Sequence, residues 1–261
     1  MAETQDLLEH DDLWGRLRRD GVPTGLADLD ALTWGLAPGA LWVVAGDPGA
    51  GKTMFLAQLA RVAALAGAST RFISGREDRQ LVVAYWLAAQ ARVPLHHLLG
   101  AQLSEDELQR LQAARQRLQA APLEVWTEAD AEWVDAVCHS TPSFSWLVEG
   151  TSQRARVMTV DDVDVLLGAP LHERIRAMRD WTRRACFTLV VSVPTAGVWH
   201  QGQLDPVIGR EADVVLVVQP EPLEAAAQAG HQELSVLRNR YGPVARIPLQ
   251  FQGFYAKYVS S

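Results

Sequence analysis

The sequence contains few cysteines and no long apolar run, and each shortage excludes a class of protein. Two cysteines are too few for the disulfide framework that stabilises small secreted domains. No stretch of about 18 apolar residues and no apolar amino-terminal signal is present, so we expect a cytoplasmic protein without a membrane segment. With 24 Lys and Arg against 31 Asp and Glu, the formal net charge is −7, which leaves only local patches for contact with nucleic acid.

The length and composition predict one large α/β domain, because 261 residues that are 48% hydrophobic can bury a sizeable core. We place this domain at residues 21–261. Residues 1–20 form a separate piece, in which Leu7, Trp14 and Leu17 supply the apolar stripe of an amphipathic helix or linker. Such a helix would cap its own domain or a neighbouring subunit, and spacing alone does not choose between them.

Beyond residue 21, apolar strand-like runs alternate with helical patterns, which predicts a mostly parallel central sheet flanked by helices. The expected strands are 41–45, 70–74, 123–126, 156–160, 186–193 and 213–218. The expected helices are 54–66, 79–92, 104–120, 129–139 and 171–184, the third beginning with a capping box of Ser104 and Glu107. A loop is expected at 140–155. Shorter runs at 232–238, 244–250 and 254–258 predict antiparallel strands at the carboxy-terminal edge.

One glycine-rich motif lies between the first strand and the first of these helices and matches the pattern G-x-x-x-x-G-K-[ST]. Its residues are Gly46, Asp47, Pro48, Gly49, Ala50, Gly51, Lys52 and Thr53. Backbone N–H groups in such a turn point at phosphate oxygens, and the following helix adds the positive end of its dipole. Lys52, one of only two lysines in the chain, would reach the β- and γ-phosphates, and the Thr53 hydroxyl would bind Mg²⁺. The motif therefore predicts a site for ATP and Mg²⁺.

A nucleotide site of this kind also needs a carboxylate at the end of a buried strand, on the magnesium side. Asp161 ends the apolar run Arg156-Val-Met-Thr-Val-Asp161 and is our candidate for this role. A neighbouring carboxylate, Asp162 or Glu77, would orient the attacking water. The sequence does not decide between these two.

The order of motifs resembles the carboxy-terminal motor domain of DnaB-type hexameric replicative helicases, within the wider group of RecA-like P-loop ATPases. The segments that carry the resemblance are Gly21-Val-Pro-Thr-Gly-Leu-Ala-Asp-Leu-Asp30, the run from Gly35 through the glycine-rich motif, Arg71-Phe-Ile-Ser74, Ala91-Arg-Val-Pro94, Gly100 through Glu107, and Leu237-Arg-Asn-Arg-Tyr-Gly-Pro243. The resemblance covers most of residues 21 to 258. It implies a RecA-like ATPase core and a DNA helicase that acts in replication.

The resemblance also implies how such chains assemble. In the matching segment of the family, a basic pair reaches the ATP of the adjacent subunit, and the corresponding residues here are Arg238 and Arg240. A guanidinium supplied in this way would stabilise the charge that develops on the γ-phosphoryl oxygens. The implied assembly is a homo-oligomer, a hexameric ring or a filament, that holds single-stranded DNA and meets replication or mobile-element proteins.

Three features depart from the family pattern. Arg76 falls where the family carries its catalytic glutamate, and Glu77 follows one residue later. Val193 replaces a glutamine that would sense the γ-phosphate. The segment 194–205, which should approach nucleic acid, contains no Lys or Arg, although Trp199 and His200 offer rings for stacking on bases.

These departures leave three hypotheses for the function. The first is a nucleic-acid-dependent ATPase that moves along single-stranded DNA. The second is a RecA-like module that binds ATP as an assembly switch and hydrolyses it slowly or not at all. The third is a regulatory or recombination ATPase of the RecA-like group, which shares the nucleotide cradle and differs in what its loops bind.

Overall fold

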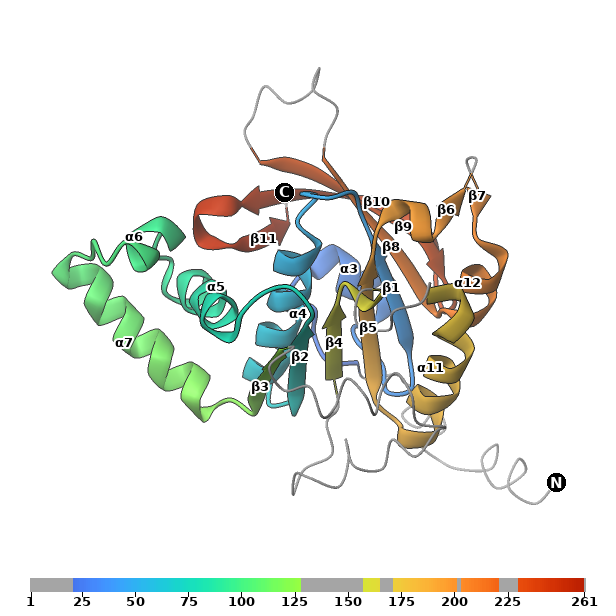
Figure 1. The fold of residues 1–261 in the computed structure, drawn as a ribbon, viewed down its shortest axis with the longest axis horizontal. Coiled ribbons are helices and arrows are strands. Elements are labelled where there is room, and N and C mark those ends of the chain that lie inside the picture. Colours follow the sequence, from blue (N-terminus) through green and yellow to red (C-terminus); the bar gives the residue numbers. More distant parts are fainter. Residues whose placement is uncertain (1–20, 128–156, 165–170, 201–202, 221–229, 261) are drawn as a thin grey trace.

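Nine strands form the central sheet of the computed structural model (Figure 1). They are β1 (Leu41–Ala45), β2 (Thr70–Ser74), β3 (Leu123–Thr127), β4 (Val157–Asp161), β5 (Thr188–Val193), β8 (Val214–Pro220), β9 (His231–Asn239), β10 (Ala245–Gln252) and β11 (Lys257–Ser260). The structure describes residues 21–127, 157–164, 171–200, 203–220 and 230–260. The helices predicted within 1–20 and at 129–139, and the loop predicted at 140–155, lie outside these residues.

The order of the strands is β11-β10-β9-β8-β1-β5-β4-β2-β3. Neighbours from β8 to β3 pair in parallel, whereas β8-β9, β9-β10 and β10-β11 pair antiparallel. The predicted architecture, a mostly parallel sheet with antiparallel strands at the carboxy-terminal edge, is therefore confirmed. Because parallel strands place their carboxyl ends at one edge, the loops after β1, β2, β4 and β5 converge there.

Both faces of the sheet are covered, and the residues of β1 show why this strand is apolar throughout. Trp42 and Val44 pack into the core on one face, with α3 (Ala27–Thr33) and α4 (Lys52–Leu65). Leu41, Val43 and Ala45 point to the other face, with α11 (Leu171–Ala185) and α12 (Pro206–Glu211). Successive side chains of a strand point to opposite faces of the sheet. Because both faces are buried here, no residue of β1 reaches solvent, and all five are apolar.

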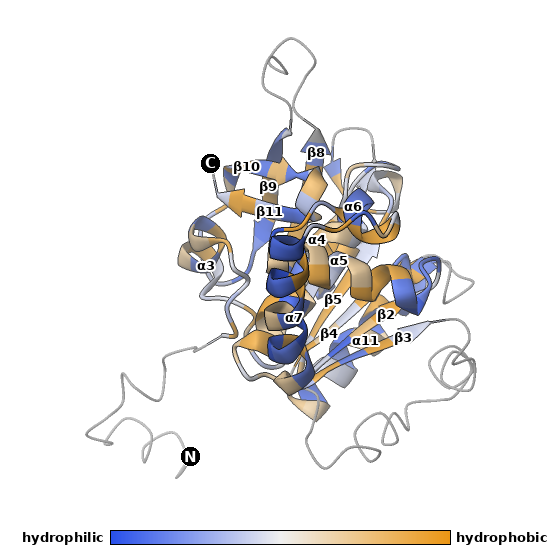
Figure 2. Cartoon of the chain, turned by 90° about the vertical axis from the view of Figure 1, so that its left-hand side faces the viewer, coloured by the Kyte–Doolittle hydropathy of each residue, from blue (hydrophilic) through white to orange (hydrophobic). Residues whose placement is uncertain are grey.

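Three further helices, α5 (Arg79–Ala91), α6 (Leu95–Leu99) and α7 (Glu105–Ala120), extend the layer beside β2 and β3 (Figure 1). A small cluster of Ala91, Val93, Leu111 and Ala114 joins α5 to α7. The rest of α7 presents hydrophilic residues outward (Figure 2). The capping box of Ser104 and Glu107 is confirmed at the start of α7. No described helix has the length and apolar character needed to cross a bilayer.

The strand predicted at 254–258 is wrong in its position. Residues Gly253–Tyr255 form a 3₁₀ turn, η3, and Ala256 has a φ of 49°, so strand β11 begins only at Lys257.

Sequence patterning also missed the short helix α12, although Asp205 followed by Pro206 is a strong start signal. The Asp205 carboxylate accepts hydrogen bonds from two N–H groups of that first turn, and proline tolerates the first helical position.

Candidate nucleotide-binding site

The glycine-rich motif forms a tight turn between the end of β1 and the start of α4, at the edge where the parallel strands end. The Gly46 N–H donates to the carbonyl of Val193 at 3.3 Å, which anchors the turn to β5. Gly51 has a φ of 92° and precedes Lys52, the first residue of α4. A Cβ at Gly51 would lie 2.1 Å from the hydroxyl oxygen of Tyr258. Both the positive φ and this close approach require glycine.

Tyr258 on β11 forms hydrogen bonds with the glycine-rich turn. Its hydroxyl lies 3.2 Å from the carbonyl oxygens of both Ala50 and Gly51, and shares its proton between them. Its backbone N–H donates to the Gln58 side chain of α4 at 2.7 Å. Burial raises the pKa of the Tyr258 hydroxyl, so this group stays a neutral donor. Sequence reasoning missed this residue, because no local pattern joins the last strand to the motif.

Lys52 lies over the mouth of the turn. Its ammonium donates to the carbonyl of Gly46 at 2.9 Å and to that of Asp47 at 3.3 Å. These contacts hold the side chain along the turn, where the phosphates of a nucleotide would approach. An ammonium has three rotatable donors, so the same group can bind phosphate oxygens without leaving the turn.

Thr53 and Asp161, the pair expected on the magnesium side of the site, lie in contact. The Thr53 hydroxyl donates to one carboxylate oxygen of Asp161 at 2.7 Å, and the Ser192 hydroxyl donates to the other at 2.6 Å. Asp161 is buried, and burial raises the pKa of its carboxyl while these two hydrogen bonds act in the opposite direction. A hydroxyl and a carboxylate in contact are oxygen ligands of the kind that Mg²⁺ takes, so the residues fit this ion.

Arg76, Glu77 and Asp162 follow the carboxyl ends of two paired strands, β2 and β4, in which Ser74 is the register partner of Asp161. The Arg76 guanidinium pairs with Asp162 at 2.7 Å. Burial, and then the charge of Asp161, raise the pKa of the Glu77 carboxyl. The Tyr85 hydroxyl lies 3.5 Å from Glu77. Of the two candidates for orienting water, Asp162 is therefore engaged with a cation, whereas the carboxylate of Glu77 has a neutral hydroxyl as its neighbour and lies within the electrostatic reach of Asp161.

Comparison with known proteins gives concordant relatives. A family model described as the DnaB-like helicase C terminal domain matches residues 21–140. A replicative DNA helicase DnaB of Leifsonia xyli subsp. xyli is 26% identical over 257 residues, which cover 91% of this chain and 55% of that protein. A solved structure of an isolated ATPase domain superposes with a TM-score of 0.78 at 14% identity, covering 100% of this chain and 96% of that one. A solved DnaB-like replicative helicase, described with its interactions with primase, gives a TM-score of 0.77 at 13% identity, covering 99% of this chain and 66% of that one.

The chain is similar to the DnaB-like helicase C terminal domain over residues 21–140. It spans about half the length of the curated DnaB relatives that match most of the chain, at 55%, 56% and 55% of three of them. The fold agrees with those of the two solved structures.

The two arginines that the DnaB resemblance places in trans lie at the end of β9. Arg238 donates through Nε to the carbonyl of Ala212 at 2.9 Å. Arg240 follows the strand, its side chain is 41% exposed, and it lies 3.6 Å from the carboxylate of Asp213. The Arg240 side chain is thus accessible. In this structure both arginines contact groups of their own chain.

Val193, which the resemblance predicts to stand in place of a sensor glutamine, is a buried side chain. Val193 ends β5 and is 0% exposed, within the core beneath α11 and α12. It therefore cannot carry the polar contact to a γ-phosphate that an amide would supply.

The segment after Val193 folds into a small hairpin of β6 (Trp199–His200) and β7 (Gln203–Leu204). Trp199 is 36% exposed and lines a hollow of about 410 Å³. Arg246 of β10 lines the same hollow. Arg246 comes from a distant strand, and its Nε lies 3.6 Å from Oε1 of Glu233. The hollow is thus lined by a cation, although the segment 194–205 contains none. Sequence reasoning did not bring Arg246 to this hollow.

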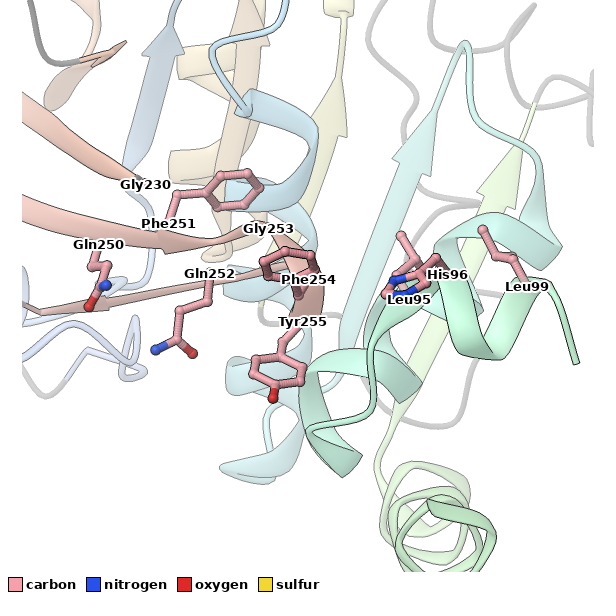
Figure 3. A pocket seen from close by; sticks show the side chains of 10 residues that line it. All are labelled: Leu95, His96, Leu99, Gly230, Gln250, Phe251, Gln252, Gly253, Phe254 and Tyr255. Carbon is pink, nitrogen blue, oxygen red and sulfur yellow. The ribbon is translucent and has the colours of Figure 1, made fainter. Parts of the chain in front are cut away.

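A second and larger hollow, of about 700 Å³, lies between α6 and the η3 turn. Figure 3 shows Phe254 and Tyr255 on one side and Leu95 and His96 on the other. No residue of the glycine-rich motif lines it, so it is separate from the nucleotide cradle.

Proposed function

We propose that this protein is an ATPase motor of the DnaB-type replicative helicase class, which moves along single-stranded DNA and whose hydrolysis of ATP depends on that DNA. The observation that carries the proposal is the contact of Thr53 with Asp161 at the end of the glycine-rich turn. This contact joins the two halves of a magnesium-nucleotide site from residues 108 positions apart. In the proposed domain division, residues 21–261 form the ATPase domain and residues 1–20 precede it as a helix or linker.

In this proposal each polar group at the cradle has one task. Lys52 would bind the β- and γ-phosphates, and Thr53 and Asp161 would hold Mg²⁺, an ion that would supply positive charge to the phosphate oxygens. Glu77 orients the attacking water and accepts its proton, since its carboxyl is close enough to Asp161 to feel that charge. Asp162 is the second candidate for this role and is already paired with Arg76.

Hydrolysis is proposed to depend on assembly. Arg240, with Arg238 beside it, supplies a guanidinium to the γ-phosphate of the neighbouring subunit in a ring or filament. The exposed fraction of Arg240 and its long contact with Asp213 support this role, because little is lost when the side chain turns outward. The assembly would be a homo-oligomer in the cytoplasm.

Single-stranded DNA is proposed to pass the hairpin of β6 and β7. Trp199 would stack on a base, and Arg246 would bind the backbone phosphate next to it. Stacking on an aromatic ring is worth about 1–3 kcal/mol per base, and it tolerates any sequence. The affinity should fall with added salt, since phosphate contacts release counterions.

Steady-state ATP hydrolysis with and without single-stranded DNA tests the proposal. We expect turnover that rises with DNA and that is abolished in Lys52→Ala. The matched control is Lys257→Ala, which removes the only other lysine in the chain and should keep turnover. No hydrolysis and no DNA binding at low salt would refute the motor.

An assembly switch is the second candidate, and two observations favour it. Arg76 stands where the family pattern has a glutamate and is paired with Asp162, and Val193 is buried where a sensor amide is expected. Such a protein would bind ATP tightly, assemble with itself or with partner proteins, and turn ATP over slowly. Tight ATP binding without DNA-dependent turnover would identify the switch, and rapid turnover lost in Lys52→Ala would refute it.

A further inference from the structure

An ion pair joins two loops at the edge of the nucleotide site. The Arg76 Nε lies 2.7 Å from Oδ2 of Asp162. Arg76 belongs to the turn after β2, and Asp162 follows the last residue of β4. The Arg76 side chain is 64% exposed and that of Asp162 is 15% exposed. An ion pair with one exposed partner contributes little to the free energy of unfolding. An effect of this pair is therefore expected on the two loops that it joins.

The Asp162 end of this pair is held rigidly. Asp162 has a φ of 50°, in the left-handed region, which aspartate enters more often than most non-glycine residues but still at a cost that the surrounding structure must offset. Its N–H donates to the Ser192 hydroxyl at 2.8 Å, and that hydroxyl donates to Asp161. The backbone of Asp162 is therefore tied to the same carboxylate that binds Thr53.

The Arg76 end belongs to a turn built on Ser74. The Ser74 hydroxyl accepts the N–H of Arg76 at 3.3 Å and that of Glu77 at 2.9 Å. Ser74 is also the register partner of Asp161 in the pairing of β2 with β4. Glu77 therefore leaves the sheet beside Asp161, on a turn held by Ser74 and by the Arg76 pair.

We propose that Arg76 is a positioning residue that fixes Glu77 for the activation of water, by tying the turn after β2 to the rigid Asp162. The inference rests on the proposed ATPase function and deepens it. Asp162 then serves as the anchor for the arginine, which leaves Glu77 to act on water. Arg76 is thus part of a site that hydrolyses ATP. The general base of this site is Glu77, one residue after the position at which the family carries its glutamate.

Kinetics of four variants test this role: Arg76→Ala, Asp162→Ala, the double variant and Arg76→Lys. Loss of the tether displaces Glu77, and a displacement of about 1 Å can cost about 100-fold in rate. We expect each single alanine variant to lower kcat by about 10-fold to 100-fold with an unchanged KM for ATP. The double variant should be no slower than either single variant, because one interaction is lost in all three. Lysine should restore part of kcat.

Two kinetic patterns would overturn the inference. If Arg76→Ala raises KM and leaves kcat unchanged, the arginine binds the nucleotide directly. If Asp162→Ala abolishes turnover while Arg76→Ala does not lower it, Asp162 is the base and the pair has no positioning role. Arg210→Ala is the matched control, since it removes another exposed, paired arginine outside the site and should leave kcat unchanged.

A second measurement does not depend on hydrolysis. Backbone hydrogen exchange at residues 75–78, without nucleotide, should become faster in Arg76→Ala and in Asp162→Ala than in the wild type or Arg210→Ala. Unchanged exchange in both variants would overturn the tether. If the wild type hydrolyses no ATP, the ATPase proposal fails by itself, and the exchange result still decides whether Arg76 holds the turn.

Discussion

Arg179 and Asp213 form a buried ion pair that joins α11 to the start of β8. The guanidinium donates to the two carboxylate oxygens at 2.8 and 3.0 Å. The same carboxylate accepts the N–H of Leu41, at the start of β1, and the hydroxyl of Tyr241. Asp213 therefore links β1, the strand that leads into the glycine-rich motif, to the segment that carries Arg240.

Removing one partner of this pair should destabilise the whole domain. Asp213→Ala leaves the Arg179 guanidinium buried without its counter-charge, which costs about 3–5 kcal/mol in comparable pairs. We expect a fall of this size in the free energy of unfolding, measured by urea denaturation. Asp106→Ala is the control, because it breaks an exposed pair with Arg110 and should change stability by less than about 1 kcal/mol. A loss below about 1 kcal/mol for Asp213→Ala would contradict the prediction.

Tyr258→Phe should lower both the stability of the domain and its affinity for ATP, although Tyr258 lies far from the glycine-rich motif in sequence. The change removes the hydrogen bonds to the carbonyls of Ala50 and Gly51 and leaves those acceptors without this donor. We expect a loss of about 1–3 kcal/mol in stability, together with weaker ATP binding by titration calorimetry. Tyr255→Phe, outside the cradle, is the control. Equal ATP affinity in the two variants would show that the turn holds its shape without the hydroxyl.

Arg240→Ala should separate binding of ATP from its hydrolysis. The variant keeps the whole cradle of its own subunit, so we expect normal ATP binding and little turnover. Mixing it with Lys52→Ala should restore part of the activity, since some interfaces then combine an intact cradle with an intact arginine. Steady-state hydrolysis as a function of the mixing ratio measures this. A mixture as inactive as the two variants would place the arginine outside the neighbouring site.

The start of α7 should respond to acid. The Ser104 N–H, then the His97 side chain, lower the pKa of the Glu107 carboxyl from 4.5 to about 2. A depressed pKa in the folded state means that Glu107 stabilises the fold above the unfolded pKa of 4.5, and that this contribution is lost as pH falls toward 2. Urea midpoints should therefore lie lower for Glu107→Gln than for the wild type at about pH 7, and the gap should shrink below pH 4.5. A gap independent of pH would refute the assignment.

Much of the fold could be predicted from sequence because its signals are local. The run 41–45 is apolar at each position, the motif at 46–53 is contiguous, and Asp161 closes a buried strand, so rules of spacing place all three. The supporting polar groups escape such rules. Ser192 is 31 residues from Asp161, and Tyr258 is 208 residues from Ala50, and each contact arises only when the sheet assembles. Arg76 was visible as a departure from a family pattern, but its partner was not, because the left-handed turn at Asp162 has no sequence signature.

The hydrogen bonds of Tyr258 also set an order of events while the chain is being made. The motif at 46–53 leaves the ribosome long before Tyr258, which follows Ala50 by 208 residues. At about 5–20 residues per second, this interval lasts about 10–40 seconds. A nascent chain would thus expose a nucleotide cradle that lacks its buried support. Emergence of β11 would complete the cradle, so we expect the growing chain to bind ATP more weakly before that point.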